Sequence, residues 1–228
     1  MREKLIYLMG LAAALMLVRN LYVILLGLPD EADQGAIYRI IFFHVPSWFT
    51  AFGMFVASGT ASALYLARKK QSYDELAVAT TEVGTVFVAI GLVTGMIWAR
   101  IIWGIWWTWD PRLTWALITW LVYAGYLMLR RAIDDPTARA KNSAVLNIFS
   151  FTSVMITYKA IDWWRTQHPA PVLSIRGAGG AMDPAMEQML YLNWLPMLMI
   201  AIILVMIRMR QEGQQREIES LRRMAHAV

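Results

Sequence analysis

Residues 77–99 read AVATTEVGTVFVAIGLVTGMIWA, an apolar stretch whose one charged side chain is Glu82. A helix rises about 1.5 Å per residue, so about 20 apolar residues are enough to cross the hydrocarbon core of a bilayer, which is roughly 30 Å thick. The stretch therefore predicts a helix that spans a membrane.

Five more apolar runs of similar length flank this stretch. The 228-residue chain is 58% hydrophobic and only 16% charged, which excludes an ordinary soluble domain. Backbone groups in lipid need internal hydrogen-bond partners, and the runs are too long for the strands of a barrel. We therefore predict an all-α integral membrane protein with six transmembrane helices, forming one domain over residues 1–207, followed by a basic cytoplasmic tail over 208–228. The predicted spans are about 5–28, 45–67, 77–99, 113–130, 143–161 and 188–207.

The lysines and arginines predict which way the spans run. If the amino terminus lies on the same side as the tail and the loops at 68–76 and 130–142, that side holds fourteen of the twenty-one basic residues. Basic residues are enriched on the cytoplasmic side, so both termini are predicted to be cytoplasmic and the loops at 29–44, 100–112 and 162–187 to face outward. The first run is too long for the core of a signal peptide, and no small-residue cleavage site follows it, so we expect it to remain as a span.

The composition excludes several kinds of site. The chain has no cysteine, so it forms no disulfide, no thiolate metal site and no covalent thioether bond to a cofactor. Its net charge of +5 is explained by the predicted orientation and requires no nucleic acid. The glycines of RGAGG, residues 176–180, lack the Gly-Lys-Ser/Thr ending of a phosphate loop, so the chain is not an ATPase.

A tryptophan-rich segment, WGIWWTWDPR at 103–112, connects the third and fourth spans. Ten of the eleven tryptophans fall in or within about two helical turns of the predicted outer loops, Trp120 lies slightly deeper, and none lies near a cytoplasmic end. Because aromatic belts normally form at both interfaces, this one-sided distribution indicates an aromatic surface on the outer face.

The segment predicts a platform for a large planar ligand. If residues 103–110 are helical, Trp103, Trp106, Trp107 and Asp110 share one face by their spacing of three and four. Tryptophan supplies a large rigid ring at low conformational cost, so such a face would be a flat aromatic surface with a carboxylate at its edge. A contact between packed helices is the alternative explanation.

Two Asp-Pro pairs predict helix starts. Asp110 with Pro111 precedes the fourth span, and Asp183 with Pro184 precedes the sixth. Aspartate is a preferred N-cap and proline is favoured at the first helical position, so a capping role and a ligand role are both open for Asp110. Residues 34–43, QGAIYRIIFF, are too short to span and predict a short helix lying at the outer interface.

Two histidines lie in predicted outer loops, His44 in FFHVPSW and His168 in TQHPAP, whereas His226 in the tail is interpreted as incidental. A neutral imidazole is a good iron ligand, and an iron porphyrin held from both faces needs two. A structural hydrogen-bonding role is the alternative. Porphyrin propionates would need cations, for which Arg112 is best placed and arginine is the suitable type. The other candidates are Arg39, Arg100 and Arg176, and a snorkelling role stays open for Arg112.

Charges inside the spans are expected to face the bundle interior because exposure to lipid is costly. These charges are Arg19, which precedes Asn20, and Glu82. They would hold helices together or hold a partner subunit.

The tail, residues 208–228, is predicted to form a helix with Ile218, Leu221 and Met224 along one face. That face would dock a cytoplasmic partner or rest on anionic lipid, and a solvated extension is the alternative.

The segment WGIWWTWD, residues 103–110, resembles the tryptophan-rich WWD signature of haem-handling proteins. Together with six spans, about 230 residues and one histidine in each flanking outer loop, the chain resembles the family of cytochrome c maturation protein C, also called haem exporter protein C. The resemblance implies that His44 and His168 are the axial ligands of a non-covalently held haem b and that Arg112 extends the signature. It implies a haem platform made by Trp103, Gly104, Trp106, Trp107, Trp109 and Asp110.

The resemblance also implies a role and partners. Such a protein holds haem at the periplasmic face of the bacterial inner membrane and presents it to a haem chaperone, in a complex with an ABC-type ATPase and permease and a small single-span subunit. It implies transfer more than catalysis, since the chain offers no nucleophile or nucleotide site. A cytochrome b type electron carrier is disfavoured because no histidine lies in a predicted span. A permease subunit without stable haem is disfavoured because no interrupted helix or midplane polar cluster is evident.

Overall fold

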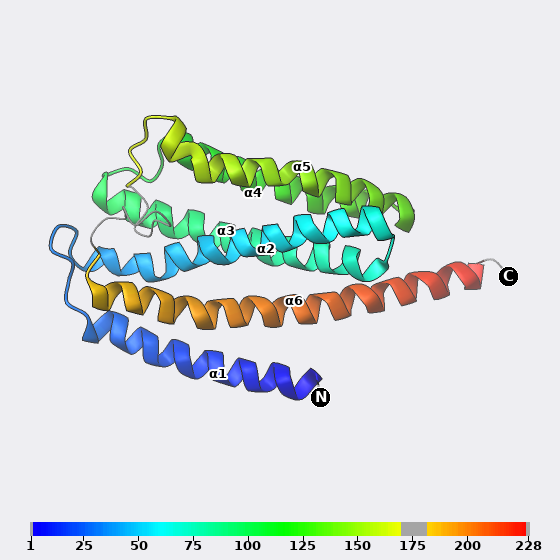
Figure 1. Cartoon of the computed structure of the whole chain (residues 1–228), viewed down its shortest axis with the longest axis horizontal. Coiled ribbons are helices and arrows are strands. Elements are labelled where there is room, and N and C mark those ends of the chain that lie inside the picture. Colours follow the sequence, from blue (N-terminus) through cyan, green and yellow to red (C-terminus); the bar gives the residue numbers. More distant parts are fainter. Residues whose placement is uncertain (1, 170–181, 227–228) are drawn as a thin grey trace.

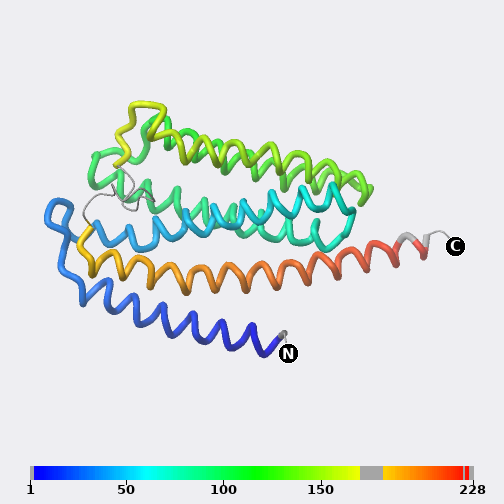
Figure 2. The backbone as a smooth tube through the Cα atoms, viewed as in Figure 1, coloured from blue at the N-terminus to red at the C-terminus, as the bar shows by residue number. Residues whose placement is uncertain are grey.

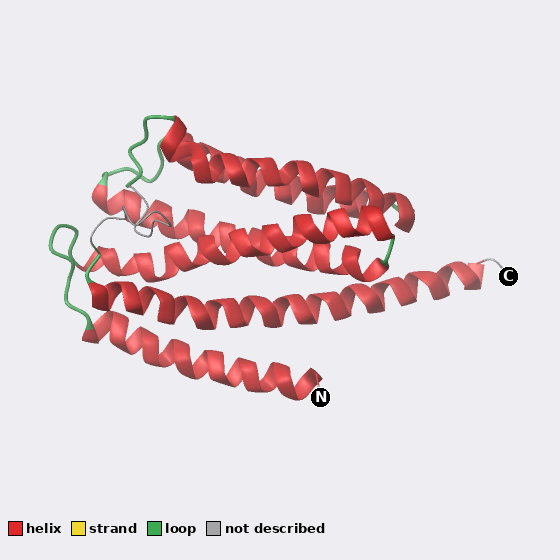
Figure 3. Cartoon of the chain, in the orientation of Figure 1, coloured by secondary structure: helices red, strands yellow, loops and turns green. Residues whose placement is uncertain are grey.

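The computed structural model describes residues 2–169 and 182–226, and over these residues Figure 3 draws only helices, turns and loops. Six helices in this part of the chain are long and apolar enough to cross a membrane, which confirms the predicted all-α class. They are α1 (Arg2–Tyr22), α2 (Ile41–Arg68), α3 (Gln71–Ile102), α4 (Pro111–Ala132), α5 (Pro136–Trp163) and α6 (Pro184–His226).

Three helices begin at an Asp-Pro pair. The Asp110 carboxylate accepts a hydrogen bond from the Arg112 N–H (2.9 Å), and Asp183 accepts one from the Ala185 N–H (2.8 Å), so both predicted caps are confirmed. Asp135 does the same for α5, which begins several residues before the predicted apolar run. The predicted span begins later, at residue 143, because the capping residue, and not hydropathy, decides where a helix begins.

The described parts of the three predicted outer loops lie at one end of the bundle, which we call the tryptophan-rich end (Figure 1). The chain between α1 and α2, the segment between α3 and α4, and the residues directly after α5 lie there. At the opposite end lie the turns joining α2 to α3 and α4 to α5, the start of α1 and the far end of α6 (Figure 2). The up-and-down order of the six helices produces this grouping.

The helices form layers, with α4 and α5 on one side, α2 and α3 in the centre, and α6 followed by α1 on the other side (Figure 1). The rings of Phe55 on α2 and Tyr123 on α4 stack in the core with centroids 3.8 Å apart. Both residues are almost fully buried. The central pair α2 and α3 is thereby covered on both faces, and α1 lies at the edge.

Helix α1 packs mainly against α6. Asn20 is buried there, and its side-chain amide donates to the Leu192 carbonyl (2.9 Å). Arg19, in contrast, is exposed, so the prediction that it faces the interior is wrong. Consecutive residues on a helix point about 100° apart. Because Asn20 faces α6, Arg19 points away from it.

The chain between α1 and α2 differs from the predicted interfacial helix. Helix α1 ends in a π-helical turn, η1 (Val23–Gly27), and a short 3-10 helix, η2 (Ala36–Ile40), runs directly into α2. Arg39 donates to the carbonyls of Ile24 (2.8 Å) and Leu28 (2.9 Å) and pairs with Asp30. The arginine thus satisfies carbonyls at the end of η1 and ties η2 to it, while η2 packs on α2 and α3.

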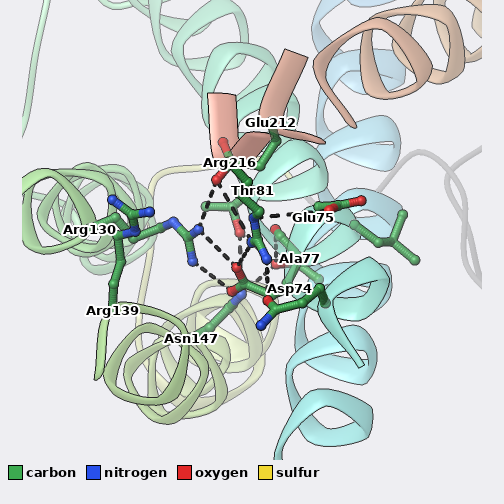
Figure 4. A network of polar contacts seen from close by, with 12 residues as sticks. Asp74, Glu75, Ala77, Thr81, Arg130, Arg139, Asn147, Glu212 and Arg216 are labelled. Atoms are coloured by element: carbon green, nitrogen blue, oxygen red, sulfur yellow. Dashed lines mark hydrogen bonds and ion pairs between the residues drawn. The ribbon is translucent and has the colours of Figure 1, made fainter. Parts of the chain in front are cut away.

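A buried ionic network joins three helices at the opposite end of the bundle (Figure 4). Arg130 on α4 makes a bidentate pair with Asp74 on α3 (2.7 and 3.0 Å), and both side chains are at most 6% exposed. Glu212 and Arg216 of α6 complete the network. Helix α6 therefore continues without a break across residue 207, the predicted domain boundary, and its next turns pack into the bundle.

Glu82 faces the bundle, as predicted, and pairs with Arg208 of α6. A polar cluster not evident from the sequence lies nearby. Ser58 of α2 bonds to Thr81 of α3 (2.5 Å) and accepts from Asn147 of α5 (2.5 Å). These groups lie on three different helices, so only packing brings them together.

Candidate ligand site at the tryptophan-rich end

The segment between α3 and α4 is not helical, so the predicted helical face of Trp103, Trp106, Trp107 and Asp110 is wrong. Helix α3 ends at Ile102, and Gly104 has a φ of +78°, in the left-handed region that favours glycine. Arg100 donates to the Gly104 carbonyl and holds this turn. Beyond the turn the chain runs without regular structure to Asp110.

The tryptophans form edge-to-face pairs instead of one flat platform. Trp98 and Trp103 meet with centroids 5.0 Å apart, and Trp107 and Trp109 meet at 5.9 Å with an interplanar angle of 83°. Trp109 is 76% exposed, and Trp106 is also exposed. The segment thus presents two large aromatic rings at the surface of the tryptophan-rich end.

Two hollows lie on either side of Trp109. One has a volume of about 290 Å³ and an entirely apolar lining from α3, the segment and α4, namely Leu92, Met96, Trp107, Trp109 and Leu117. The other, of about 560 Å³, is more polar and is lined by Thr108, Trp109, Asp110, Pro111, Arg165, Thr166 and Gln167. An apolar hollow beside a polar one suits a ligand with an apolar body and charged substituents.

Asp110 has more than a capping role. Its carboxylate is buried and accepts from the hydroxyl of Thr166 (2.8 Å) and from the N–H of Gln167 (2.8 Å) besides the cap bond. Burial alone would raise the pKa of Asp110, but the hydrogen bonds from Thr166, Gln167 and Arg112 hold it below its ordinary value. The charged carboxylate therefore joins the segment to the loop after α5.

His168 lies in that loop and is held in a defined state. Its backbone N–H donates to the Thr166 hydroxyl (3.0 Å), and its ring Nδ1 donates to the Pro169 carbonyl (2.8 Å). Burial and the positive charge of Arg112 lower the pKa of His168 to about 4. The imidazole is therefore neutral near pH 7 and carries a lone pair on Nε2.

His44 lies in the first turn of α2 and not in a loop, which corrects the prediction that no histidine lies in a span. The Thr94 hydroxyl donates to the Ile90 carbonyl (2.7 Å), so its oxygen accepts from Nδ1 of His44 (3.0 Å). The Nε2 atom of His44 makes no hydrogen bond within residues 2–169 and 182–226. The two imidazoles also lie within electrostatic range of each other and of Arg112.

Two glycines on α3 make room for the α2 side chains. A Cβ at Gly95 would lie 3.0 Å from Cε1 of His44, and one at Gly91 would lie 2.7 Å from Nε1 of Trp48. Sequence reasoning missed Thr94 and both glycines. The spacing in GLVTG, residues 91–95, was the available signal, since glycines four apart in an apolar helix permit close helix contact.

Among the candidate cations, Arg112 is distinguished by an unused donor. Its Nη1 atom is buried without a hydrogen-bond partner in the part of the chain that the structure describes, and so is Nε1 of Trp107. Arg39 and Arg100 are bonded to carbonyls, and Arg176 lies outside the described residues. Buried donors without acceptors are costly, so Arg112 and Trp107 are available to an acceptor from outside the described residues.

Known proteins resemble this chain over most of its length. A family model described as Heme exporter protein C matches residues 1–224. A protein of that name from Bradyrhizobium diazoefficiens is 35% identical over 215 residues, covering 93% of this chain and 80% of that protein. Proteins with the same name from Paracoccus denitrificans and Escherichia coli are 33% and 30% identical, covering 85% and 80% of this chain and 80% and 73% of their own lengths.

Proposed function

Because the chain belongs to the Heme exporter protein C family, we propose that it binds haem at the tryptophan-rich end of its bundle and handles haem for cytochrome c maturation. The observation that carries this proposal is the matched state of two imidazoles. His44 and His168 each use Nδ1 as a donor, and their Nε2 atoms, like one donor of the neighbouring Arg112, have no hydrogen-bond partner among the described residues.

This arrangement suits haem iron. Iron binds neutral imidazole nitrogen, and a hydrogen bond from the other ring nitrogen fixes the tautomer and the ring orientation. The Thr94 hydroxyl supplies this support for His44, and the Pro169 carbonyl supplies it for His168. A histidine that only stabilised the fold would not need its second nitrogen left free.

The remaining groups suit the rest of the haem molecule. Arg112 Nη1 and Trp107 Nε1 are donors for the propionates, since arginine binds carboxylates through its fork. The apolar hollow between Trp107, Trp109, Leu92 and Met96 would cover part of the porphyrin. Trp103, Gly104 and Trp106 complete the surface, and Asp110 positions His168.

We further propose a transfer role in the bacterial inner membrane. Haem b would be held without a covalent bond, because the chain has no cysteine, at an end of the bundle that faces the periplasm. The orientation rests on the positive-inside rule. A periplasmic haem chaperone would receive the haem, and the partners would be ABC-type ATPase and permease subunits and a small single-span subunit.

The test is the haem absorption band of protein purified after co-expression with the chaperone and a haem supply. We expect a band in the unaltered protein, and a haem content lowered roughly tenfold or more in His44→Ala and in His168→Ala. The control is the third histidine, His226, which lies at the end of α6 far from the tryptophan-rich end. His226→Ala should keep the band. Unchanged haem in the double variant His44→Ala, His168→Ala would overturn the ligand assignment. No band in the unaltered protein would instead favour a permease subunit without stable haem.

A further inference from the structure

Arg19 is an exposed charge on the outer face of α1, in the last turn before η1. Its one hydrogen bond within the described residues goes from Nη1 to the Asn20 side-chain oxygen (3.1 Å). It pairs with no carboxylate in the part of the chain that the structure describes, and residues 1, 170–181 and 227–228 contain no aspartate or glutamate. The guanidinium thus has a polar neighbour but no counter-charge.

Arg19 lies too deep in its span to be an interfacial residue. At about 1.5 Å per residue, it is on the order of 12 Å from the end of η1 at Gly27 and on the order of 25 Å from the start of α1. Side chains on a helix tilt toward its N-terminus, which for Arg19 is away from the nearer interface. Snorkelling to that interface is therefore disfavoured, and the charge needs a partner within the membrane.

The side chains around Arg19 form a seam suited to another helix. Five large apolar residues, each more than half exposed, follow one stripe of α1 at alternating spacings of three and four, namely Leu8, Leu11, Leu15, Val18 and Tyr22. This is the spacing with which two helices pack side by side. Arg19 flanks the seam next to Val18, while the other side of α1 packs on α6.

We propose that this seam docks a transmembrane helix of a different protein, and that the docking helix carries an aspartate or glutamate at the depth of Arg19. A second copy of this chain does not fit. Two α1 helices paired about a symmetry axis would set Arg19 beside its own copy at the same depth, where like charges repel. The one carboxylate of the apolar stretch 77–99, Glu82, is already bonded to Arg208.

The proposal does not rest on haem binding and goes beyond it. It assigns the edge helix α1 a role in assembly, by an interaction between opposite charges in lipid, where an unpaired charge is costly. The expected partner is recognised by its chemistry, an apolar span of about 20 residues interrupted by one carboxylate.

Photo-cross-linking of the full chain in its native membrane tests the proposal. A photoreactive residue at Val18 should form adducts with a peptide from another protein, and mass spectrometry should place that peptide in a span containing an aspartate or glutamate. Arg19→Leu should lower the adduct yield roughly tenfold at equal protein level, and Arg19→Lys should preserve most of it. The control is the same probe at Phe149 of α5, which is 71% exposed and should react with lipid alone.

Four results would overturn the proposal. The adducts at Val18 could contain lipid alone, or they could join two copies of this chain. The cross-linked span could lack a carboxylate, or the adducts could persist in Arg19→Leu. A charge exchange sharpens the test. Arg19→Glu should abolish the adduct, and replacing the carboxylate of the identified span by lysine should restore it. The haem band measured on the same membranes keeps this result separate from that of the proposed function.

Discussion

The hydroxyl of Thr166 donates to the buried carboxylate of Asp110 (2.8 Å) and accepts from the backbone N–H of His168 (3.0 Å). Asp110, in the tryptophan-rich segment, therefore sets the position of His168, which is more than fifty residues away in the sequence. Asp110 acts through this contact, since both oxygens of its carboxylate are bonded within the chain.

Asp110→Asn should loosen the loop that carries His168. The amide keeps one acceptor oxygen, but its NH₂ group faces either the Gln167 N–H or the Thr166 hydroxyl as a second donor. Hydrogen bonds to a buried charged group contribute about 1.5–3 kcal/mol each, so haem retention should fall at least roughly tenfold. The measurement is haem per protein after purification. Thr166→Val should reproduce the loss, and a normal haem content in both variants would contradict the positioning role.

The charge state of His168 leads to a pH prediction. Burial and Arg112 lower the pKa of His168 to about 4, so the ring is neutral above that value and takes up a proton only as the pH falls toward 4. The folded state therefore binds fewer protons than the unfolded state between about pH 6.5 and 4, and this histidine destabilises the fold as the pH falls through that window. Nuclear magnetic resonance of the labelled ring measures the titration.

Arg112→Gln is the matched change for that titration. Removing the positive charge should raise the pKa of His168 toward its ordinary value, while burial should keep it below that value. A ring that titrates near pH 6.5 in the unaltered protein would contradict the burial, and an unchanged pKa in Arg112→Gln would contradict the electrostatic contact.

Gly95→Ala should displace His44. The added Cβ would lie 3.0 Å from Cε1 of the imidazole, closer than ordinary van der Waals contact, and the ring is tied to α3 by its bond to Thr94. We expect a changed haem absorption spectrum and a lower haem content with the protein still in the membrane. Gly53→Ala on α2, where a Cβ would meet nothing within 4 Å, is the control. Identical spectra for both variants would place His44 outside the haem site.

Arg130→Met should destabilise the bundle without affecting haem. Removing one partner of a buried ion pair costs about 3–5 kcal/mol, because Asp74 keeps its charge with fewer partners. For a chain of this size that corresponds to a drop of roughly 10 °C in Tm, measured in detergent. Arg210→Met removes an exposed pair with Glu3 and should change Tm little. A lost haem band in Arg130→Met at low temperature would show that the two ends of the bundle are coupled.

The candidate site could be predicted in part. The residue types and the end of the bundle follow from the sequence, because the tryptophans and two of the histidines fall between particular apolar runs. The supporting residues do not follow. Thr94 and Thr166 are ordinary hydroxyl residues whose importance depends on which ring or carboxylate packs beside them.

The sequence by itself determined the number of membrane helices, their order and the Asp-Pro starts of α4 and α6. Hydropathy adds up along the chain, and a cap bonds to the backbone two or three residues away, so neither needs distant partners. The tertiary structure decided that Asn20 and not Arg19 faces α6, and which donor of Arg112 has no partner among the described residues. Those outcomes depend on side chains far apart in sequence competing for one helix face or one hydrogen bond, and only the packed bundle settles that competition.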